Sequence, residues 1–572
     1  MKKFCLSLFM LACSSFVAQA IPANGQWKTH VQSDGSVIVL RLVGDEFCHY
    51  YEAEDGTILK QLANGDFVPS AEGFFTMEQR KAAAMQHRAS VRKQPSASLK
   101  NSISNYTKRK GLVIIMEFPD LTMSQDNSWQ QWNDILNKEG YNEYDAVGSV
   151  HDYFYDQSNG QFDISFDVFG PFMAQKGYSY YGTNGDSSNE LDVKVCDLIE
   201  EACLAIRGQT DFSQYDWDND GEVDQVVVLF AGIGENVKGT PSDHIWPHEY
   251  YLQYCDPKYN PNQGLLLDGI VINTYAVVSE LNGPTILSGL GTFCHEFSHC
   301  LGLPDLYTYS GLDTNGGFDL MSSGSFNNAG WTPSGYSAYE KLCCGWITPT
   351  PLTEPTTVTG LIPLADGGEA FIIRNESVEK DIDEYYLLEN RQKTRWDQYI
   401  PSQGLIITHV DYDPWAWYYN QVNDNASHPR VCIVPANNRW DERYAMGFAY
   451  PYRTLHSKND SLTDNSKPAA TVYHRPVGVT FATQYYLGKP ITNITNSGGV
   501  VSFNLMGGNT SGIHDIAANG ASSNWKALVG KPVKIYDLSG HLVYSTSSFI
   551  SAESLPLSSG IYIVNGQQYQ LK

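Results

Sequence analysis

Two histidines spaced four residues apart carry the strongest chemical signal in this chain. In the segment His295-Glu-Phe-Ser-His299, a helical backbone puts both imidazoles on one face, with Glu296 beside them. Two such imidazoles can bind one metal ion, and an adjacent carboxylate can serve as a general base. The pattern predicts a metal-dependent hydrolase. The alternative is a pair of helix histidines that pack near a core.

The residues that follow extend this pattern toward a third ligand. With Gly302 and Asp305 the segment becomes His-Glu-x-x-His-x-x-Gly-x-x-Asp, which resembles the metzincin pattern of zinc peptidases. In that pattern the glycine ends the helix and turns the chain so that a third residue returns to zinc. The third residue is usually histidine, but the carboxylate of Asp305 is also an acceptable zinc ligand. Glu340, on a later predicted helix, is the alternative third ligand.

A wider group of motifs is similar to secreted metallopeptidases of the immune inhibitor A type. The motifs lie at residues 295–307, 317–324, 335–339, 386–392 and 404–411, and the resemblance covers residues 30–505. It implies a secreted zymogen with a propeptide, a zinc endopeptidase domain and a β-rich domain behind it. It also implies that Met321 forms a base under the zinc site without binding the metal.

The residue types also indicate a mechanism. Zinc held by His295, His299 and Asp305 leaves one coordination position for water. The metal lowers the pKa of that water and polarises the scissile carbonyl, while Glu296 removes the proton and delivers it to the leaving amine.

Several weaker signals each have a structural alternative. Tyr336 or Tyr339 is a candidate donor to the oxyanion, or a packing residue. Cys48 is a candidate thiolate that blocks zinc in the zymogen, or a core residue. His244 and His248 are candidates to line the cleft, or structural residues.

A second cluster of candidate ligands is acidic. Its members are Asp216, Asp218, Asp220, Glu222 and Asp224, with Gly221 among them. Aspartates at positions 1, 3, 5 and 9 and glycine at position 6 match the first nine positions of a calcium-binding loop. Position 12 is Val227 instead of glutamate, so the EF-hand pattern is incomplete. The sequence predicts a calcium site here, and the alternative is a solvated acidic turn.

The N-terminus is typical of an export signal. Lys2 and Lys3 precede an apolar run at residues 4–17, and Ala18-Gln19-Ala20 fits a cleavage site. The run is too short to span a bilayer, and no later segment is long enough either. A lipoprotein signal that ends at Cys13 is the alternative. We expect export through the periplasm and a secreted or surface-attached product that is not an integral membrane protein.

Composition excludes several classes of protein. The chain has 572 residues, of which 42% are hydrophobic and 13% aromatic, so global disorder is excluded and several domains are expected. A net charge of −25 argues against nucleic-acid or anionic-membrane partners. Nine of the 11 cysteines follow the signal, so at least one is unpaired. Most of them are expected to pack as small buried hydrophobes.

Charge and periodicity predict the elements that position these residues. Residues 79–110 hold nine basic and no acidic residues, which predicts an exposed, cleavable connector, whereas residues 111–511 hold 20 basic and 51 acidic residues. Apolar runs predict strands at 111–118, 224–231 and 270–278, and helical spacing predicts helices at 147–155, 190–206, 286–300 and 335–343. Strand-and-turn patterns fill residues 21–76, 350–503 and 533–564.

The expected fold class is a multidomain α/β + β protein. It comprises a signal peptide (1–20), a small β-rich propeptide with its connector (21–106), a metzincin-like α/β zinc peptidase domain (107–349), a β-sandwich-like domain (350–506) and a C-terminal β domain (512–572). Residues 533–543 and 557–564 resemble the C-terminal sorting domain of type IX secretion, which implies that secretion machinery as a partner. The alternative for this tail is an ordinary small β-domain.

These features predict a monomeric zinc endopeptidase, made as a zymogen, that acts on protein or peptide substrates. A surface adhesin or glycan-binding protein with a decayed peptidase segment is one alternative. The aromatic run at residues 415–419 is a candidate to bind glycans, and the alternative for this run is a turn or core role. The intact Glu296 argues against decay, because a binding module needs no general base. A zinc hydrolase with a non-protein substrate is the other alternative.

Overall fold

The computed structural model divides into two compact units. Unit 1 comprises residues 1–93, 114–124 and 170–284, and unit 2 comprises residues 94–113, 125–169 and 285–572. The structure describes residues 19–20, 23, 27–45, 49–62, 64–70, 108–184, 192–237, 239–307, 315–378, 382–418, 420–425, 427–439, 447–455, 458–508, 525–537, 542–558, 560–564 and 567–571. Most of the predicted signal peptide and of the basic connector, and Cys48, therefore lie outside the described residues.

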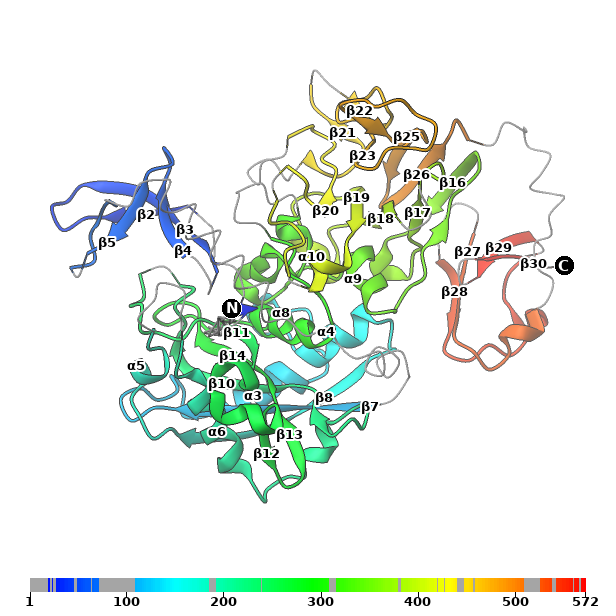
Figure 1. Cartoon of the computed structure of the whole chain (residues 1–572). Helices are drawn as coiled ribbons and strands as arrows, with labels where there is room; N and C mark the ends of the chain where they lie inside the picture. The colour runs from blue at the N-terminus through cyan, green and yellow to red at the C-terminus, as the bar shows by residue number, and fades with distance from the viewer. Residues whose placement is uncertain are drawn as a thin grey trace, which may run out of the picture. The chain divides into compact units, whose positions relative to one another are not determined.

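An antiparallel five-stranded sheet in unit 1 forms the first described module (Figure 1). Its strands follow the sequence order: β2 (Lys28–Val31), β3 (Val37–Gly44), β4 (His49–Ala53), β5 (Ile58–Gln61) and β6 (Phe67–Pro69). Gly56 and Gly65 form two of the tight turns with φ of +82° and +87°, a region that favours glycine. Leu40, Leu59 and Phe67 form a small core. The strand content predicted for residues 21–76 is confirmed in the described residues.

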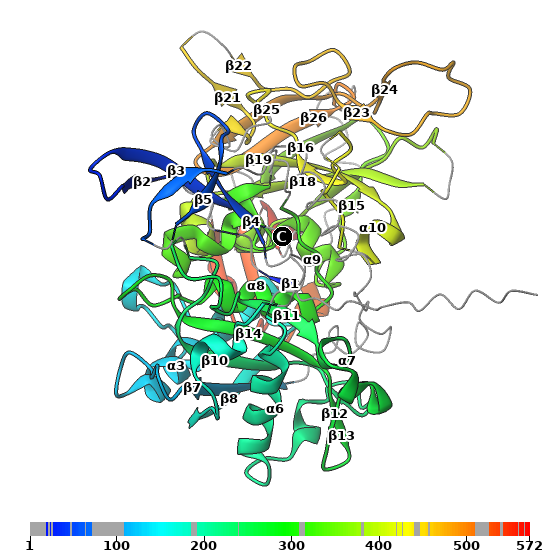
Figure 2. The same ribbon diagram turned by 60° about the vertical axis from the view of Figure 1, so that its left-hand side comes forward.

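A six-stranded mixed sheet forms the framework of the α/β region. Its order is β1 (Gln19–Ala20), β11 (His248–Tyr251), β14 (Thr274–Leu281), β10 (Val226–Ile233), β7 (Lys108–Glu117) and β8 (Asp163–Met173). Strands β10 and β14 are parallel and lie side by side in both views (Figures 1 and 2). Both are almost continuously buried, as expected of strands covered on both faces. The strands predicted at 111–118 and 224–231 are confirmed as β7 and β10.

The prediction of a single strand at residues 270–278 is wrong, because Asn273 separates two strands that belong to different sheets. The main chain of Asn273 accepts a hydrogen bond from the N–H of Leu252, and its side chain accepts one from the N–H of Gln253. Before the break, β13 (Ile270–Ile272) joins a separate sheet with β12 (Leu265–Leu267) and β9 (Glu222–Val223), and after it β14 joins the central sheet.

Capping residues explain where two of the predicted helices begin. Helix α4 (Val150–Gln157) and helix α9 (Ala338–Cys343) each start with a capping box, made by Ser149 with Asp152 and by Ser337 with Glu340. Helix α6 (Val195–Ile206) begins later than the predicted residue 190. The sequence analysis missed α3 (Ser128–Asn137) and strand β8, and the short helices α5 (Tyr178–Tyr181) and α7 (Leu252–Cys255).

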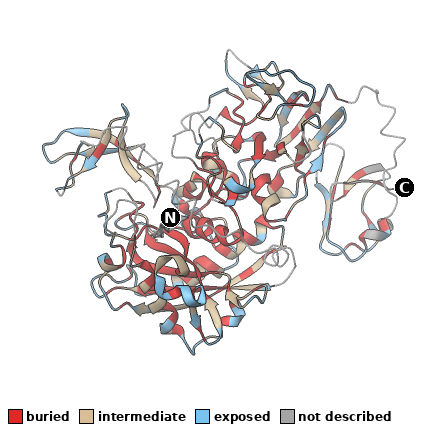
Figure 3. Ribbon diagram, in the orientation of Figure 1, coloured by how far each residue is buried: buried red, intermediate tan, exposed pale blue. Residues whose placement is uncertain are grey.

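Helix α8 (Gly291–Cys300) carries the histidine motif and starts later than the predicted residue 286. Gly289 has a φ of +71°, and a Cβ on it would come within 2.6 Å of the carbonyl oxygen of Gly330. A Cβ on Gly291 would lie 1.9 Å from the carbonyl oxygen of Ser325. The backbone at Gly289 and Gly291 therefore packs directly against the backbone of residues 325–330, which leaves no room for a side chain at the start of the helix. All of α8 is buried (Figure 3).

Two sheets with a shared core make up the second half of unit 2. One has the order β15 (Thr350–Pro351), β17 (Phe371–Ile373), β18 (Asp383–Arg391), β19 (Gly404–Tyr412) and β20 (Val431–Ile433), and the other has the order β16 (Thr356–Leu361), β26 (Val500–Leu505) and β25 (Ile491–Ser497). Phe371, Leu388, Ile407 and Phe503 belong to the core that both sheets share. Short strands β21 (Tyr452–Arg453), β22 (Lys458–Asn459), β23 (Thr471–Val472) and β24 (Tyr485–Tyr486) and helix α10 (Pro414–Tyr418) complete this region.

The C-terminal residues form a small sheet with a core of its own. Its order is β28 (Leu542–Thr546), β27 (Val533–Tyr536), β29 (Gly560–Val564) and β30 (Gln567–Leu571). Trp525, Ile535, Phe549 and Val564 are among the residues that pack inside it. The strands predicted in this tail are confirmed.

Two further expectations concern the chain as a whole. Of the eight cysteines in the described segments, six are buried, as expected of small apolar side chains. Among the helices of the described residues, none combines the length and the apolarity that a bilayer crossing requires.

Candidate functional site

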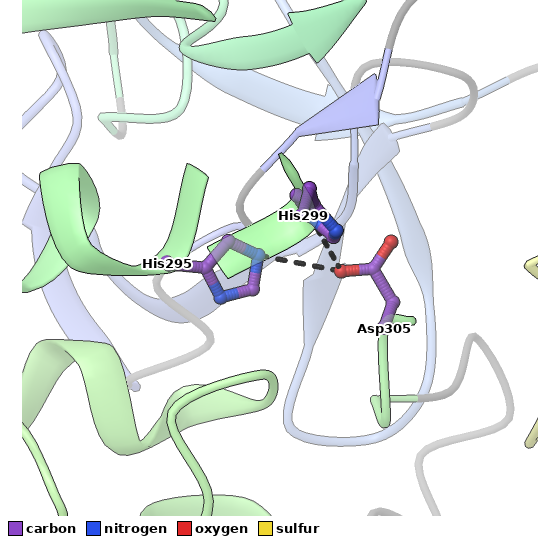
Figure 4. A group of neighbouring side chains, drawn as sticks. All are labelled: His295, His299 and Asp305. Atoms are coloured by element: carbon purple, nitrogen blue, oxygen red, sulfur yellow. Dashed lines mark ion pairs between the residues drawn. The ribbon is translucent and has the colours of Figure 1, made fainter. Parts of the chain in front are cut away.

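Three side chains from α8 and the loop after it meet in one buried group (Figure 4). The Nε2 atoms of His295 and His299 lie 3.3 and 3.4 Å from the same carboxylate oxygen, Oδ1 of Asp305. At most 1% of any of the three side chains is exposed. The structure thus brings the two predicted histidines and the predicted aspartate together.

Backbone carbonyls orient both imidazoles toward Asp305. His295 Nδ1 lies 2.8 Å from the carbonyl oxygen of Leu320, and His299 Nδ1 lies 2.9 Å from that of Leu303. Since a carbonyl oxygen can only accept, each Nδ1 carries the proton and each Nε2 keeps its lone pair. This is the usual arrangement of a metal-binding histidine, whose second nitrogen donates to an outer partner.

The helix ends as the glycine in the motif predicts. Gly302 has a φ of +90°, and its N–H donates to the carbonyl oxygen of His299 at 2.9 Å. The N–H of Leu303 donates to the carbonyl oxygen of Ser298 at 3.3 Å, which completes a Schellman turn. The turn brings the carbonyl of Leu303 back to His299 and leads the chain on to Asp305. One glycine therefore positions two of the three candidate ligands.

Asn420 holds the third candidate ligand in place, and the sequence analysis missed it. Its side-chain amide donates to Oδ2 of Asp305, and its Oδ1 accepts the N–H of Asp305 at 2.7 Å. Asn420 itself adopts a φ of +50°, which asparagine tolerates better than most residues. Its position, 115 residues from Asp305, gives no local signal that would have identified it.

The group fits a zinc ion. Nε2 of His295 is buried and has no hydrogen-bond partner within the part of the chain that the structure describes, although a buried polar atom normally has one. Two imidazole nitrogens and one carboxylate oxygen are ligands that zinc commonly takes in catalytic sites. The residues present are therefore a suitable zinc-binding set.

The other residues of the motif lie around this group. Glu296 follows His295 on α8 and is fully buried. Met321 is buried directly after Leu320, and its carbonyl oxygen accepts the N–H of Leu306 at 2.8 Å. The Met321 segment therefore touches both the partner of His295 and the loop that carries Asp305.

Glu340, the alternative third ligand, lies in a different environment. Its carboxylate accepts the N–H of Ser337 at 2.7 Å in the capping box of α9 and the N–H of Met321 at 3.2 Å. Burial raises the pKa of Glu340 well above its usual range, and the nearby Asp319 adds to this effect. The structure thus places Asp305, and not Glu340, in the group with the two histidines.

The two candidate oxyanion donors lie in packed surroundings. The hydroxyl of Tyr336 hydrogen-bonds with that of Ser298 on α8, and its ring stacks on Trp346. The hydroxyl of Tyr339 accepts a hydrogen bond from the indole of Trp417. Burial raises the pKa of both phenols. An oxyanion role for either tyrosine stays a prediction.

The acidic loop brings three of its five candidate ligands together. One oxygen of each of Asp216, Asp218 and Asp220 lies within 4.8 Å of the others. Glu222 instead accepts a hydrogen bond from the hydroxyl of Thr274 at 3.3 Å. Asp224 accepts one from the N–H of Trp217 at 2.5 Å, and burial raises its pKa to about 8.

The histidines of the weaker prediction both lie in unit 1 and contact backbone carbonyls. His244 Nδ1 is 3.2 Å from the carbonyl oxygen of Ile233, and His248 Nδ1 is 2.6 Å from that of Trp246. Burial lowers the pKa of His248 to about 4, so this imidazole is neutral at neutral pH.

In the aromatic run at residues 415–419, Trp417 is buried, whereas Trp415 is 67% exposed.

Comparison with known proteins supports the same chemistry. Residues 99–344 match the family model of the immune inhibitor A peptidase M6, catalytic domain. This segment is therefore a metallopeptidase domain of the peptidase M6 type. The resemblance stated from the motifs is confirmed for this part of the chain.

Several curated proteins are similar to the same region. The pre-pro-metalloprotease PrtV of Vibrio cholerae serotype O1 is 25% identical over 272 residues, which are 41% of this chain and 29% of PrtV. Immune inhibitor A of Bacillus thuringiensis subsp. alesti is 24% identical over 297 residues, 44% of this chain and 42% of that protein. A protein of Arthroderma benhamiae named as a secreted metallopeptidase is 26% identical over 241 residues, 37% of this chain and 33% of that protein. The chain thus spans less than half the length of each of these relatives.

Proposed function

We propose that this chain, which carries a peptidase M6-type metallopeptidase domain, is a secreted zinc endopeptidase that hydrolyses peptide bonds in extracellular proteins. The observation that supports the proposal most directly is the buried group of His295, His299 and Asp305. Their separations of 3.3 and 3.4 Å suit three ligands of one small cation. Glu296 lies on the same helix and supplies the general base.

The chain's own residues divide the work of the reaction. His295, His299 and Asp305 would hold zinc, which when bound polarises the scissile carbonyl and acidifies water. Glu296 takes the proton from the attacking water and passes it to the leaving amine. The carbonyls of Leu320 and Leu303 hold the proton of each imidazole on Nδ1, so that the unprotonated Nε2 faces Asp305.

Two variants separate metal binding from base catalysis. Glu296→Gln keeps the shape of the side chain and all three ligands, so we expect stoichiometric zinc by mass spectrometry and a fall in casein hydrolysis of ~10²–10⁴-fold. His299→Ala removes a ligand, so zinc and activity should both fall. Glu354→Gln, a change at an exposed glutamate, is the matched control and should leave both unchanged.

Near-normal proteolysis by processed Glu296→Gln protein would refute the proposal, as would an active enzyme without stoichiometric zinc. A peptide mixture analysed by mass spectrometry also separates the alternatives. Internal cuts support an endopeptidase, whereas intact peptides would favour the non-protein hydrolase or the glycan-binding protein.

We also infer that residues 21–106 form a propeptide that is removed by cleavage in the basic stretch at 79–110. A separate β-module followed by nine basic and no acidic residues supports this inference. The uncut form should hydrolyse casein more slowly than the cut form. Equal rates would contradict the inference.

The tail supports a route of secretion. The four-stranded module β27–β30 has its own core, and we infer that it is a sorting domain for type IX secretion. Deletion of residues 512–572 should leave zinc content and activity intact but trap the protein in the periplasm of its host. Normal delivery of the truncated protein to the surface would exclude this role.

We further propose calcium at Asp216, Asp218 and Asp220, with Asp224 and Glu222 as further ligands of a rearranged loop. The oxygen-only donors and the clustered negative charge support it. Calcium should raise the melting temperature through binding to the native state, and Asp218→Ala should reduce that shift. An unchanged shift in this variant would rule the site out.

A further inference from the structure

Two buried carboxylates face each other in the sheet that follows the peptidase segment. Glu384 on β18 and Asp411 on β19 are direct cross-strand partners. Only 2% of each side chain is exposed. Like charges directly opposite each other destabilise a sheet, and buried charges need compensation. Positive charge must therefore be supplied inside this cluster.

One oxygen of each carboxylate is already bound by neighbouring cations or imidazoles. Oε1 of Glu384 lies 2.8 Å from Nε2 of His409. Oδ2 of Asp411 lies 2.9 Å from a guanidinium nitrogen of Arg430 and 2.6 Å from Nε2 of His428. These contacts fix the two carboxyl groups in orientation and leave the second oxygen of each to point elsewhere.

The two remaining oxygens converge on His474. Its Nδ1 lies 3.0 Å from Oε2 of Glu384 and 3.4 Å from Oδ1 of Asp411, and the three atoms lie within 4.8 Å of one another. The backbone N–H of His474 also donates to Oε2 of Glu384 at 3.1 Å, which holds this residue against the sheet.

The 3.4 Å separation of His474 Nδ1 from Oδ1 of Asp411 suits two ligands of one metal ion, whereas the 3.0 Å separation of Nδ1 from Oε2 of Glu384 is a hydrogen-bond distance. Two ligands bound to tetrahedral zinc at about 2.0–2.2 Å lie about 3.3–3.6 Å from each other. In the peptidase group the corresponding separations are 3.3 and 3.4 Å. An imidazole nitrogen beside two carboxylate oxygens favours a transition metal such as zinc over calcium, which prefers oxygen alone.

We propose that Glu384, Asp411 and His474 bind a second zinc-class divalent metal ion, distinct from the peptidase zinc. The side chains of His474 and His428 are 34% and 30% exposed, so the site is open to solvent for metal entry and for a water ligand. Its role is structural, because the ion would join β18, β19 and the segment after β23 in one cross-link.

The packing around the site agrees with such a cross-link. The ring of Tyr473 stacks on His428 at 3.7 Å and on His409 at 5.0 Å between ring centres. The residue next to His474 is therefore held by both of the other histidines. A metal at His474 would fix the segment that follows β23 to the edge of this stack.

The test is zinc binding in a full-length protein whose peptidase site is disabled. His299→Ala protein is stripped of metal, kept in calcium to occupy oxygen-only sites, and titrated with Zn²⁺ by calorimetry. We expect one tight site and a rise in melting temperature. Asparagine keeps a hydrogen-bond donor but is a poor metal ligand. Adding His474→Asn should therefore lower the zinc affinity by more than about 100-fold and abolish the rise in melting temperature.

The matched control is His428→Asn in the same background. Among the three proposed ligands, the His428 imidazole contacts only Asp411, through the oxygen Oδ2 that is not proposed to bind the metal, so this variant should keep the site. Absence of tight zinc in folded His299→Ala protein would overturn the proposal, and would identify the cluster as carboxylates bridged by a protonated imidazole. Equal zinc affinity with and without His474→Asn would also overturn it. If the double variant does not fold, X-ray absorption of zinc-loaded protein that carries both His295→Ala and His299→Ala decides. The proposal requires a single nitrogen ligand, and the peptidase group then supplies none.

Discussion

Asn420 both donates to the carboxylate of Asp305 and accepts from its backbone N–H, so it sets the direction in which this candidate ligand points. Outer partners of this kind typically change metal affinity by about 10–100-fold when removed. Asn420 is a positioning residue in this sense, because it acts on zinc through Asp305. Its backbone φ of +50° decides how it can be replaced.

The substitution Asn420→Gly removes both hydrogen bonds without adding strain at a positive φ. Zinc affinity should fall about 10–100-fold, and excess zinc should restore much of the casein hydrolysis. Competition with a chelator measures the affinity. Asn438→Gly is the matched control, since Asn438 is exposed and has a φ of +57°. Equal chelator resistance of the two variants would contradict the role of Asn420.

At the scale of elements, a buried arginine joins β18 to the loops that support α8. Arg391 contacts both oxygens of Asp397 at 2.6 Å and donates to the carbonyl oxygens of Gly335 and Phe318 at 2.8 and 3.2 Å. Asp397 in turn accepts the N–H of Gly335 at 2.9 Å. Strand β18 therefore stabilises the stretch that contains Met321.

The substitution Arg391→Met leaves Asp397 buried without its main cation. Breaking a buried pair from one side typically costs about 3–5 kcal/mol of the free energy of unfolding. Arg374→Met is the control, because Arg374 pairs with Asp383 while 42% of its side chain is exposed, and such pairs contribute about 0–1 kcal/mol. Chemical denaturation of the two variants gives both values. Similar losses in both would show that the Arg391 network is not a major stabilising contact.

At the scale of the molecule, the N-terminal module contacts the rest of unit 1 through a titratable pair. Nε2 of His49 lies 3.3 Å from Oε1 of Glu235, and the imidazole stacks on Trp246 at 4.6 Å between ring centres. The hydroxyl of Tyr51 accepts the N–H of Gly239 at 2.9 Å. Burial alone would lower the pKa of His49, but the charge and hydrogen bond of Glu235 outweigh it and raise the pKa above 6.5.

A raised pKa in the docked state means that docking favours the protonated imidazole. The stability that this protonation gives to the docked module is complete below pH 6.5, the pKa of a free histidine. It is lost as the pH rises through the raised pKa of His49. Hydrogen-exchange protection of β4 in the uncut protein should therefore be higher at pH 5.5 than at pH 8.5. His49→Gln should flatten this difference, whereas His30→Gln, in the same module, should keep it. An unchanged pH dependence in His49→Gln protein would contradict the mechanism.

The sequence by itself determined the parts of the site that depend on local spacing. Residues His295 and His299 share a face because helical periodicity repeats within four residues, and Gly302 ends the helix because glycine accepts a positive φ. Buried strands such as β10 were predictable for the same reason, since a run of apolar residues is a local pattern. The division of the chain into domains is not predictable in this way, because the compact units combine segments that are distant in sequence.

Only the tertiary structure decided which distant groups meet. Asn420 lies 115 residues from Asp305, and Glu384 faces Asp411 only through the register of β18 with β19. The start of α8 likewise depends on backbone atoms of residues 325–330 that pass close to Gly289 and Gly291. Such contacts form through the packing of whole elements, and spacing along the chain carries no trace of them. That is the physical reason why the helix motif could be predicted and its partners could not.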